Sequence, residues 1–456
     1  MDQKLSVEKS GQIILPDHEL YEVKRKVWNG AVDRRPAVIF ECKSEADVVS
    51  AVKYANDQNL TISIRGGGHH VAGTAVCDNG VMIDLSNMKE VHVEEYRRVA
   101  IVEGGATLAD IDCETQKYGL ATPTGTVSKT GVAGLALGGG FGYLRGKYGL
   151  TCDNIVGVRM VTAEGEIISV NETEHEDLFW AIRGGGGNFG IVTSFELQLH
   201  EVGPNVLAID VLYDYKDVEQ VLQKIQTYMK TAPDEISINV AIVQLPPEPF
   251  LPDHLHHKRV VTVSGIYIGE LNRMIEEEII EPLVTLAEPI IDNTGIVPYV
   301  EVQKKLDPMV PDGVPVDGTS LFLKELTDET IQILLEEINN AELPMVMVQL
   351  WALHGQMNRV SSDDTAFAIR DAGYLLIIDG EIPKDNPSSC SNWMTSVYER
   401  ILPFSHHGSA YLNGVKVDKD ITKKTYRTNY EKLSIIKGKY DPRNMFCHNH
   451  NIEPNE

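Results

Sequence analysis

The sequence lacks several features that would place it in a familiar class. No apolar run reaches the roughly 18 residues that span a bilayer, and the first twenty residues hold no apolar signal-peptide core. Six cysteines are spread over 456 residues without a CxxC pair, which is too sparse for a disulfide framework. No basic patch offsets the net charge of −25. We therefore expect a cytoplasmic protein without a nucleic-acid or membrane partner, whose oligomeric state stays open.

The chain is long enough for two or three domains, because its hydrophobic fraction of 43% supports large cores. Glycine-rich short elements fill residues 1–203, with a core over about 33–202. Long alternating strands and amphipathic helices follow over 204–397, and short motifs return over 398–456. Strands of that length, separated by helices, predict an α+β fold in which helices cover one face of a wide antiparallel sheet.

Local signals define several elements of the first part. A helix is expected from Glu45, with Ser44 as N-cap and Asp47 completing the start. A second helix follows Thr107 and is terminated by Gly119. Residues 153–170 predict a β-hairpin with its turn at 164–165.

Three glycine clusters occupy this part of the chain, at residues 66–68, 131–142 and 184–190. Any one of them could be a tight turn, but three together indicate a ligand that lies along backbone over a long path. Backbone amides in such loops bind phosphate. A Rossmann fingerprint is not met, because the stretch GGGFGYLRG has too many glycines and no preceding strand, and no Walker loop is present. A dinucleotide extended through several loops fits the pattern.

Five stretches of the sequence closely resemble one family of flavoproteins. They are IRGGGHHVAG, GTVSKTGVAGLALGGGFG, GLTCDNIVGVRMVTAEG, GGGGNFGIVTSFE and NYEKLSIIKGKYDPRNMF. The chain resembles a bacterial-type member of the berberine-bridge-enzyme-like FAD-linked oxidases, in order from about residue 33 to the C-terminus. The resemblance implies a flavin domain of the PCMH, or vanillyl-alcohol-oxidase, type and a separate substrate domain.

The resemblance also implies how the flavin is attached. His69 corresponds to the histidine that bonds covalently to the 8α-methyl of the isoalloxazine, with a noncovalent imidazole beside the ring as the alternative. Many relatives add a cysteine bond to flavin C6, but the corresponding residue here is Val127. We therefore expect FAD held through His69 only, with a less strongly raised redox potential than in doubly linked relatives.

The remaining cofactor contacts are carried over by motif. Backbone of the first glycine cluster and His70 is expected around the pyrophosphate, and the strand that follows the third cluster around the adenosine half. The expected FAD-binding residues besides His69 and Val127 are Arg65, Gly66, Gly67, Gly68, His70, Gly125, Thr126, Thr130, Gly131, Gly134, Gly138, Gly140, Phe141, Gly142, Gly190, Ile191, Val192 and Asn413. Arg65, together with Asp84 and Arg183, also fits a structural hydrogen-bonding role.

The chemistry expected from a flavin is hydride transfer from a substrate C–H, while a base takes the neighbouring O–H or N–H proton. Tyr411 of AYLNG is the first candidate for the base and Tyr426 the second. A packed aromatic is the alternative for either, because relatives carry a second tyrosine where this chain has Gly414. The catalytic glutamate or glutamine of some relatives aligns with Ile378, with Asp379 beside it, so that acid/base role is expected to be lost.

The sequence gives less direct indications of the substrate and the electron acceptor. Trp351 and His354 are expected to face a small alcohol, sugar or secondary metabolite. Thr130 stands where relatives control oxygen access, and its small side chain favours an oxidase that passes electrons to O2 and releases hydrogen peroxide. Two alternatives stay open: an FAD-binding structural, coat-type protein that has lost turnover, and a dehydrogenase with another acceptor.

Histidine groups at 254–257, 406–407 and 448–450 match no structural zinc spacing. They are interpreted as solvated loops, and no metal is expected.

Overall fold

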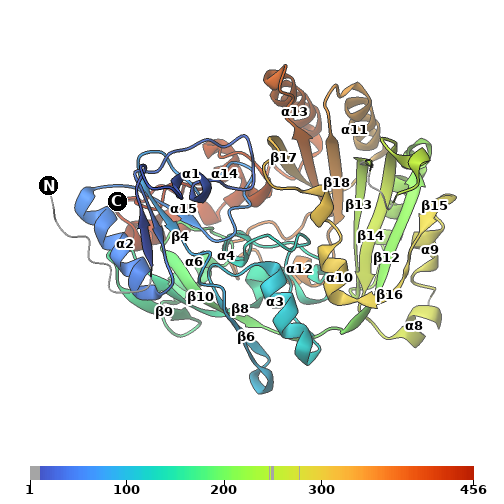
Figure 1. Cartoon of the computed structure of the whole chain (residues 1–456). Helices are drawn as coiled ribbons and strands as arrows, with labels where there is room; N and C mark the ends of the chain where they lie inside the picture. The colour runs from blue at the N-terminus through green and yellow to red at the C-terminus, as the bar shows by residue number, and fades with distance from the viewer. Residues whose placement is uncertain (1–10, 246, 248–250, 277, 456) are drawn as a thin grey trace.

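The computed structural model describes residues 11–245, 247, 251–276 and 278–455, and it confirms the predicted α+β architecture. Two small sheets lie in the N-terminal half and one wide sheet in the C-terminal half (Figure 1). The transition falls between strand β11 (His200–Glu201), which pairs with β7 (Leu120–Ala121), and strand β12 (Asn205–Asp214). No described helix is long and apolar enough to cross a bilayer.

The first sheet carries the first glycine loop at the end of one strand. Its order is β1 (Gln12–Ile14), β2 (Val38–Glu41), β4 (Val81–Asp84) and β3 (Ile62–Arg65). Helix α2 (Glu45–Gln58) covers it, and its predicted start is confirmed because the Ser44 hydroxyl accepts a hydrogen bond from the Asp47 amide. Strand β3 therefore delivers residues 66–70 directly beyond the sheet edge.

The second sheet holds the other N-terminal strands. Its order is β5 (Val91–Glu94), β6 (Val99–Glu103), β10 (Ile191–Gln198), β8 (Ile155–Val161) and β9 (Ile167–Asn171). The pairing of β8 with β9 confirms the predicted hairpin. Helices α3 (Leu108–Thr115), α4 (Val132–Leu137), α5 (Arg145–Tyr148) and α6 (Glu176–Ile182) belong to this half. The predicted cap of α3 is present, since Thr107 and Asp110 form a reciprocal capping box and Gly119 ends the segment in a left-handed conformation.

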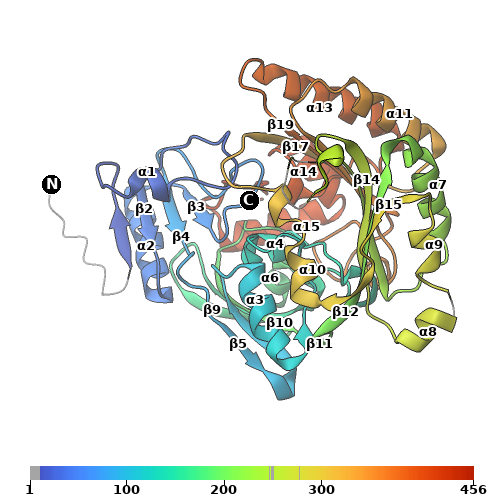
Figure 2. The same ribbon diagram turned by 45° about the vertical axis from the view of Figure 1, so that its right-hand side comes forward.

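The wide sheet is antiparallel and eight-stranded, with the order β15-β12-β14-β13-β18-β19-β17 and with β16 beside β12. Its further strands are β13 (Ile236–Gln244), β14 (Arg259–Tyr267), β15 (Pro289–Asp292), β16 (Gly295–Pro298), β17 (Val316–Leu323), β18 (Val346–Ala352) and β19 (Tyr374–Glu381). Helices α7 (Val218–Met229), α9 (Glu281–Val284), α11 (Asp328–Asn340) and α13 (Pro387–Ile401) lie along its outer side (Figure 2). Helices α8 (Leu271–Glu276), α10 (Tyr299–Lys304) and α12 (Gln356–Arg359) lie in its connections.

One face of the wide sheet is buried under those helices. Val348 and Leu350 of β18 and Leu376 and Ile378 of β19 pack in one core with Val397 of α13. Because side chains alternate along a strand, the residues between them point to the opposite face. That opposite face is turned toward the N-terminal half.

The C-terminal segment returns to the N-terminal half through α14 (Lys419–Tyr426) and α15 (Asn429–Tyr440). Lys437 of α15 is fully buried, and its ammonium donates to the Asp441 carboxylate at 2.6 Å and to the Asn188 carbonyl at 2.7 Å. The third glycine cluster is thus fixed by residues more than 240 positions away in the sequence.

Candidate active site

A cavity of about 480 Å³ lies between the glycine loops and the open face of the wide sheet. Its lining contains residues from the loops after β3 and before α4, from the third glycine cluster, from β18 and β19, and from the C-terminal segment. These segments are far apart in the sequence, and the fold brings them to one place.

Most of the residues expected from the sequence line this cavity. They are Gly66, Gly67, Gly68, His69, His70, Gly125, Thr126, Val127, Thr130, Gly131, Gly134, Gly138, Phe141, Gly190, Val192, Tyr411, Asn413 and Tyr426.

Four expected residues lie outside the lining. Arg65 pairs with the buried Asp84 carboxylate and donates to the Lys24 carbonyl at 2.7 Å, which is the structural role. Gly140 and Gly142 pack against Thr151 and the Thr124 carbonyl, where a side chain would clash. Ile191 is fully buried in the core of the first sheet. The Arg183 side chain, too, is held by backbone, because it donates to the Asp364 carbonyl at 2.8 Å.

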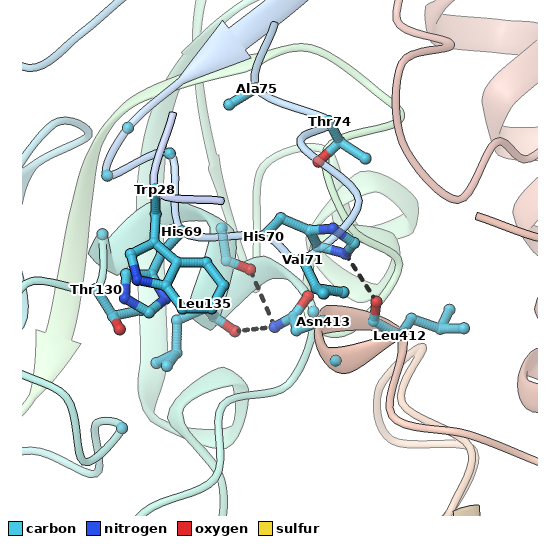
Figure 3. Close-up of a pocket in the computed structure, with 18 of the residues that line it drawn as sticks. Trp28, His69, His70, Val71, Thr74, Ala75, Thr130, Leu135, Leu412 and Asn413 are labelled. Atoms are coloured by element: carbon cyan, nitrogen blue, oxygen red, sulfur yellow. Dashed lines mark hydrogen bonds between the residues drawn. The ribbon is translucent and has the colours of Figure 1, made fainter. Parts of the chain in front are cut away.

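His69 has the environment of a reactive neutral imidazole. Its ring stacks on Trp28, with centroids 4.6 Å apart and planes at 16° (Figure 3). Burial lowers its pKa to about 4. The ring is therefore neutral at neutral pH, and one of its nitrogens keeps a free lone pair. Nε2 is buried, and no described residue forms a hydrogen bond with it. Because buried polar atoms are rarely left unpaired, this atom fits a site whose remaining partner is a ligand.

The glycine loops form a cradle with room for a ligand. Gly67 and Gly131 approach so closely that a Cβ on Gly67 would lie 2.3 Å from the Gly131 nitrogen. At Gly134 and Gly187, in contrast, a Cβ would meet nothing within 4 Å. Both residues line the cavity, so their bare backbone faces its open space. Gly67 and Gly131 allow the two loops to lie together. Gly134 and Gly187 leave backbone open to a bound phosphate or ring.

The C-terminal segment closes one side of the cradle. The Asn413 side-chain amide donates to the carbonyls of Gly134 and Leu135, both at 3.3 Å, and to the Tyr411 hydroxyl at 3.1 Å. His70 Nε2 lies 2.9 Å from the Leu412 carbonyl (Figure 3). These bonds join α4, the first glycine loop and residues 411–413 into one wall.

The loop at residues 125–130 is held from the other half of the chain. Ser128 donates its amide to the Asp307 carboxylate at 2.8 Å. Gln303 of α10 donates to the Gly125 carbonyl at 3.0 Å. Val127 and Thr130 of this loop line the cavity, and none of the described lining residues is a cysteine.

Burial also determines the protonation of the two candidate tyrosines. Tyr411 stands edge-on to Phe141 at 4.8 Å, and burial raises the pKa of its hydroxyl to about 12. Burial raises the pKa of Tyr426 as well. Both hydroxyls are therefore protonated at neutral pH and keep a hydrogen that a bound ligand can accept.

The wide sheet contributes groups that the sequence alignment assigned to the wrong face. Ile378 packs under the helices, whereas Ile377, Asp379 and Glu381 line the cavity. Burial, and then the charge of Asp317, raise the pKa of Asp379 to about 7. Asp379 thus lies on the face that an acid/base group needs, although the role itself was expected to be lost at this strand.

The neighbouring strand β18 presents Met347, Gln349 and Trp351 to the cavity, and Met345 just before it lines the cavity as well. Trp351 faces it as expected. His354 does not line it, and its Nε2 lies 3.2 Å from the Pro233 carbonyl. The contribution of Met345, Met347 and Gln349 could have been found from strand alternation once Trp351 was assigned to that face.

Two of the histidine groups are not solvated loops. His406 is buried, with Nε2 at 3.0 Å from the Asp371 carboxylate. His448 and His450 line the cavity, and burial lowers the pKa of His450 to about 3. His254 and His257 are exposed, as expected. Among the described residues, no three His, Cys, Asp or Glu side chains gather as metal ligands would.

These observations fit FAD. Bare glycine backbone lines one wall, His69 with its buried and unpaired Nε2 belongs to the lining, and the sheet closes the far end. The expected cofactor and the residues present therefore agree.

Two family profiles match the chain at this site. One, described as "FAD binding domain", matches residues 36–171, and the other, described as "Berberine and berberine like", matches residues 410–453. The first contains the loops around His69 and Val127, and the second contains Tyr411 and Asn413.

Similar proteins and structures extend over the whole chain. An FAD-linked oxidoreductase of Dictyostelium discoideum is 34% identical, covering 94% of this chain and 91% of the relative. The (R)-6-hydroxynicotine oxidase of Paenarthrobacter nicotinovorans is 31% identical, covering 100% and 99%. The crystal structure of 6-hydroxy-D-nicotine oxidase from Arthrobacter nicotinovorans superposes with a TM-score of 0.86 at 29% identity, covering 100% of both chains.

A glucooligosaccharide oxidase from Acremonium strictum has a TM-score of 0.87 at 26% identity, covering 98% of this chain and 97% of that one. It is described as carrying a 6-S-cysteinyl, 8α-N1-histidyl FAD. These likenesses confirm the expected PCMH-type fold.

Proposed function

Because the chain belongs to the berberine-bridge-enzyme-like family of FAD-linked oxidoreductases, we propose that it oxidises a small-molecule substrate with an FAD bound covalently through His69, and that dioxygen accepts the electrons. The chain is an FAD-dependent enzyme. The covalent link, the acceptor and the catalytic residues are the proposal.

The observation that carries the proposal is the unpaired Nε2 of a neutral His69 in a glycine-lined cavity. When bound there, FAD supplies a two-electron acceptor that dioxygen can reoxidise to give hydrogen peroxide. A neutral imidazole is the form that can bond to the flavin, and burial keeps it neutral. Stacking on Trp28 fixes the ring plane.

A single bond to the cofactor is proposed because Val127 stands where doubly linked relatives have cysteine and no described lining residue is a cysteine. The backbone of residues 66–68, 131–134 and 186–190 would hold the cofactor. Asn413 would keep the wall beside it in place, since its amide hydrogens are already engaged by Gly134 and Leu135.

We assign the substrate proton to Asp379. A general base works best when its pKa lies near the operating pH, and the pKa of Asp379 is raised to about 7. Tyr411, with its pKa raised to about 12, keeps its proton and orients the substrate as a donor. Tyr411 becomes the base only if bound cofactor or substrate lowers its pKa substantially.

The choice of dioxygen is supported by Thr130, which lines the cavity and stands at the position that the resemblance links to oxygen access. Its small side chain leaves a path for O2, and loop amides nearby would stabilise negative charge during reoxidation.

The test uses the purified holoenzyme, reduced anaerobically and mixed with air-saturated buffer in a stopped-flow cell. An oxidase reoxidises within seconds and forms hydrogen peroxide, and Thr130→Leu slows that reaction. Reoxidation over many minutes would indicate a dehydrogenase. Failure of every alcohol, sugar and amine to bleach the flavin would indicate a protein without turnover.

A further inference from the structure

The sheet end of the cavity has an unbalanced charge. Asp379 and Glu381 line it, and no lysine or arginine is among the described lining residues. The histidines of the lining do not compensate, because burial lowers the pKa of His69, His70, His448 and His450 and keeps all four uncharged at neutral pH.

Asp379 has no stabilising partner among the described residues. A Cβ built on Gly318 would lie 2.7 Å from Asp379 Oδ1 and 3.4 Å from Val71, so the carboxylate stands beside the loop that follows His69 and His70. Among the described residues, no cation or hydrogen-bond donor holds it, and the like charge of Asp317 further raises its pKa. Asp317 itself is neutralised by Lys416 at 2.5 Å.

The rest of this end is apolar, with two free N–H donors. Met345, Met347, Ile377 and Val316 line it, which leaves few partners for a ring of sugar hydroxyls. Only 4% of Trp351 is exposed, and its Nε1 has no hydrogen-bond partner among the described residues. Gln349 lines the cavity and accepts from Asn239 at 3.0 Å through Oε1, which leaves its amide nitrogen free to donate.

From these groups we propose that the substrate is an apolar amine, bound as its ammonium ion by Asp379, with a hydrogen-bond acceptor directed at Gln349 and Trp351. The inference rests on the proposed function and names its substrate class. Met347 lies opposite Asp379 in the sheet, and Gln349 follows two residues on, so the acceptor would lie about 7 Å from the ammonium along the strand.

The reaction balances with the groups already named. The ammonium nitrogen gives a proton to the Asp379 carboxylate, and the adjoining carbon gives a hydride, with its two electrons, to FAD. The carbon–nitrogen single bond becomes a protonated imine. Dioxygen takes the two electrons and two protons and leaves as hydrogen peroxide.

The experiment separates charge from shape. Benzyltrimethylammonium is permanently charged, and neopentylbenzene is its neutral isostere. Isothermal titration calorimetry on the full-length protein should show the cation bound roughly tenfold or more tightly than the isostere, as expected for a partly buried ion pair. Asp379→Asn should remove that preference. Glu399→Gln, which removes an exposed acid of α13 on the other side of the same sheet, should retain it.

A second measurement compares benzylamine with benzyl alcohol and cellobiose as reductants of the flavin. Reduction by benzylamine alone agrees with the inference. Equal affinity for the two isosteres, or an undiminished preference in Asp379→Asn, overturns it even if cellobiose reduces the flavin and the proposed function stands. A purified protein without flavin would contradict the proposed function. The calorimetry would still show whether the cavity prefers the cation to its neutral isostere.

Discussion

Single residues of the cavity differ in acid–base character because they differ in surroundings. Burial raises the pKa of Asp379 to about 7 and that of Tyr411 to about 12, while it lowers that of His69 to about 4. One carboxyl can therefore exchange a proton near neutral pH, one phenol keeps its proton, and one imidazole stays neutral.

This difference predicts which variant loses catalysis. Asp379→Asn should lower kcat by roughly 10²–10⁴-fold, the usual range for a general base. Tyr411→Phe should lower it less, because only a donor is removed. In the wild type, kcat/KM should rise as the pH increases through about 7 and Asp379 ionises, and the rise should be absent in Asp379→Asn.

Steady-state rates and flavin content from pH 5.5 to 9 test this assignment. The charged groups near Asp379 are Asp317 with its partner Lys416, and Glu381 on the same strand. A larger loss in Tyr411→Phe than in Asp379→Asn would return the base to the tyrosine.

Residue identity explains what could be predicted at this scale. Glycine loops can be recognised in a sequence because close backbone approach requires glycine, and those loops do line the cavity. Asp379 could not be assigned by alignment, since a shift of one residue moves a strand side chain to the other face. His450 was missed because its position depends on packing of the C-terminal segment, for example on Thr422 at 3.1 Å from its Nδ1.

Among the elements, the connection between α10 and the loop at 125–130 links the two halves at the cofactor. Ser128 donates to the Asp307 carboxylate through its hydroxyl, at 2.5 Å, as well as through its amide. Nearby, Lys129 pairs with Asp312 at 2.8 Å, but both side chains are more than half exposed.

Asp307→Asn should lower the free energy of unfolding by about 1–3 kcal/mol, because the buried Ser128 loses its charged acceptor. Asp312→Asn is the matched control, and it should change stability by less than about 1 kcal/mol, as exposed pairs do. Urea unfolding of the two variants measures the difference. Equal effects would show that Asp307 does not hold the loop.

The elements themselves were largely predictable where local signals dominate. The caps of α2 and α3 and the hairpin of β8 and β9 follow from short-range patterns. Helix α13 passes residue 397, so we propose that the substrate domain extends to about residue 402, while the boundary near 203 stays a prediction.

For the whole molecule, buried histidines link folding to pH. His200 stacks on Tyr148 at 3.9 Å and lies 2.7 Å from Asn154 Oδ1. Burial lowers its pKa from 6.5 to about 4. Between pH 6.5 and 4, the unfolded chain therefore binds a proton at His200 that the folded chain does not bind. The free energy of unfolding decreases as the pH falls through this range.

His200→Gln keeps a donor for Asn154 and removes the titration. Its Tm should fall less steeply between pH 7 and 4.5 than that of the wild type. His254→Gln, at an exposed residue, should follow the wild type. Thermal unfolding at several pH values provides the comparison, and identical slopes in all three proteins would exclude His200 as a source of acid sensitivity.

The whole fold serves one arrangement, a glycine cradle with a neutral His69 facing a sheet that carries Asp379. The most direct test is the intact mass of the denatured protein, followed by peptide mapping. We predict an increase equal to one FAD, located on the peptide that contains His69 and lost in His69→Ala. An unmodified mass, or flavin attached to any other residue, would contradict the account.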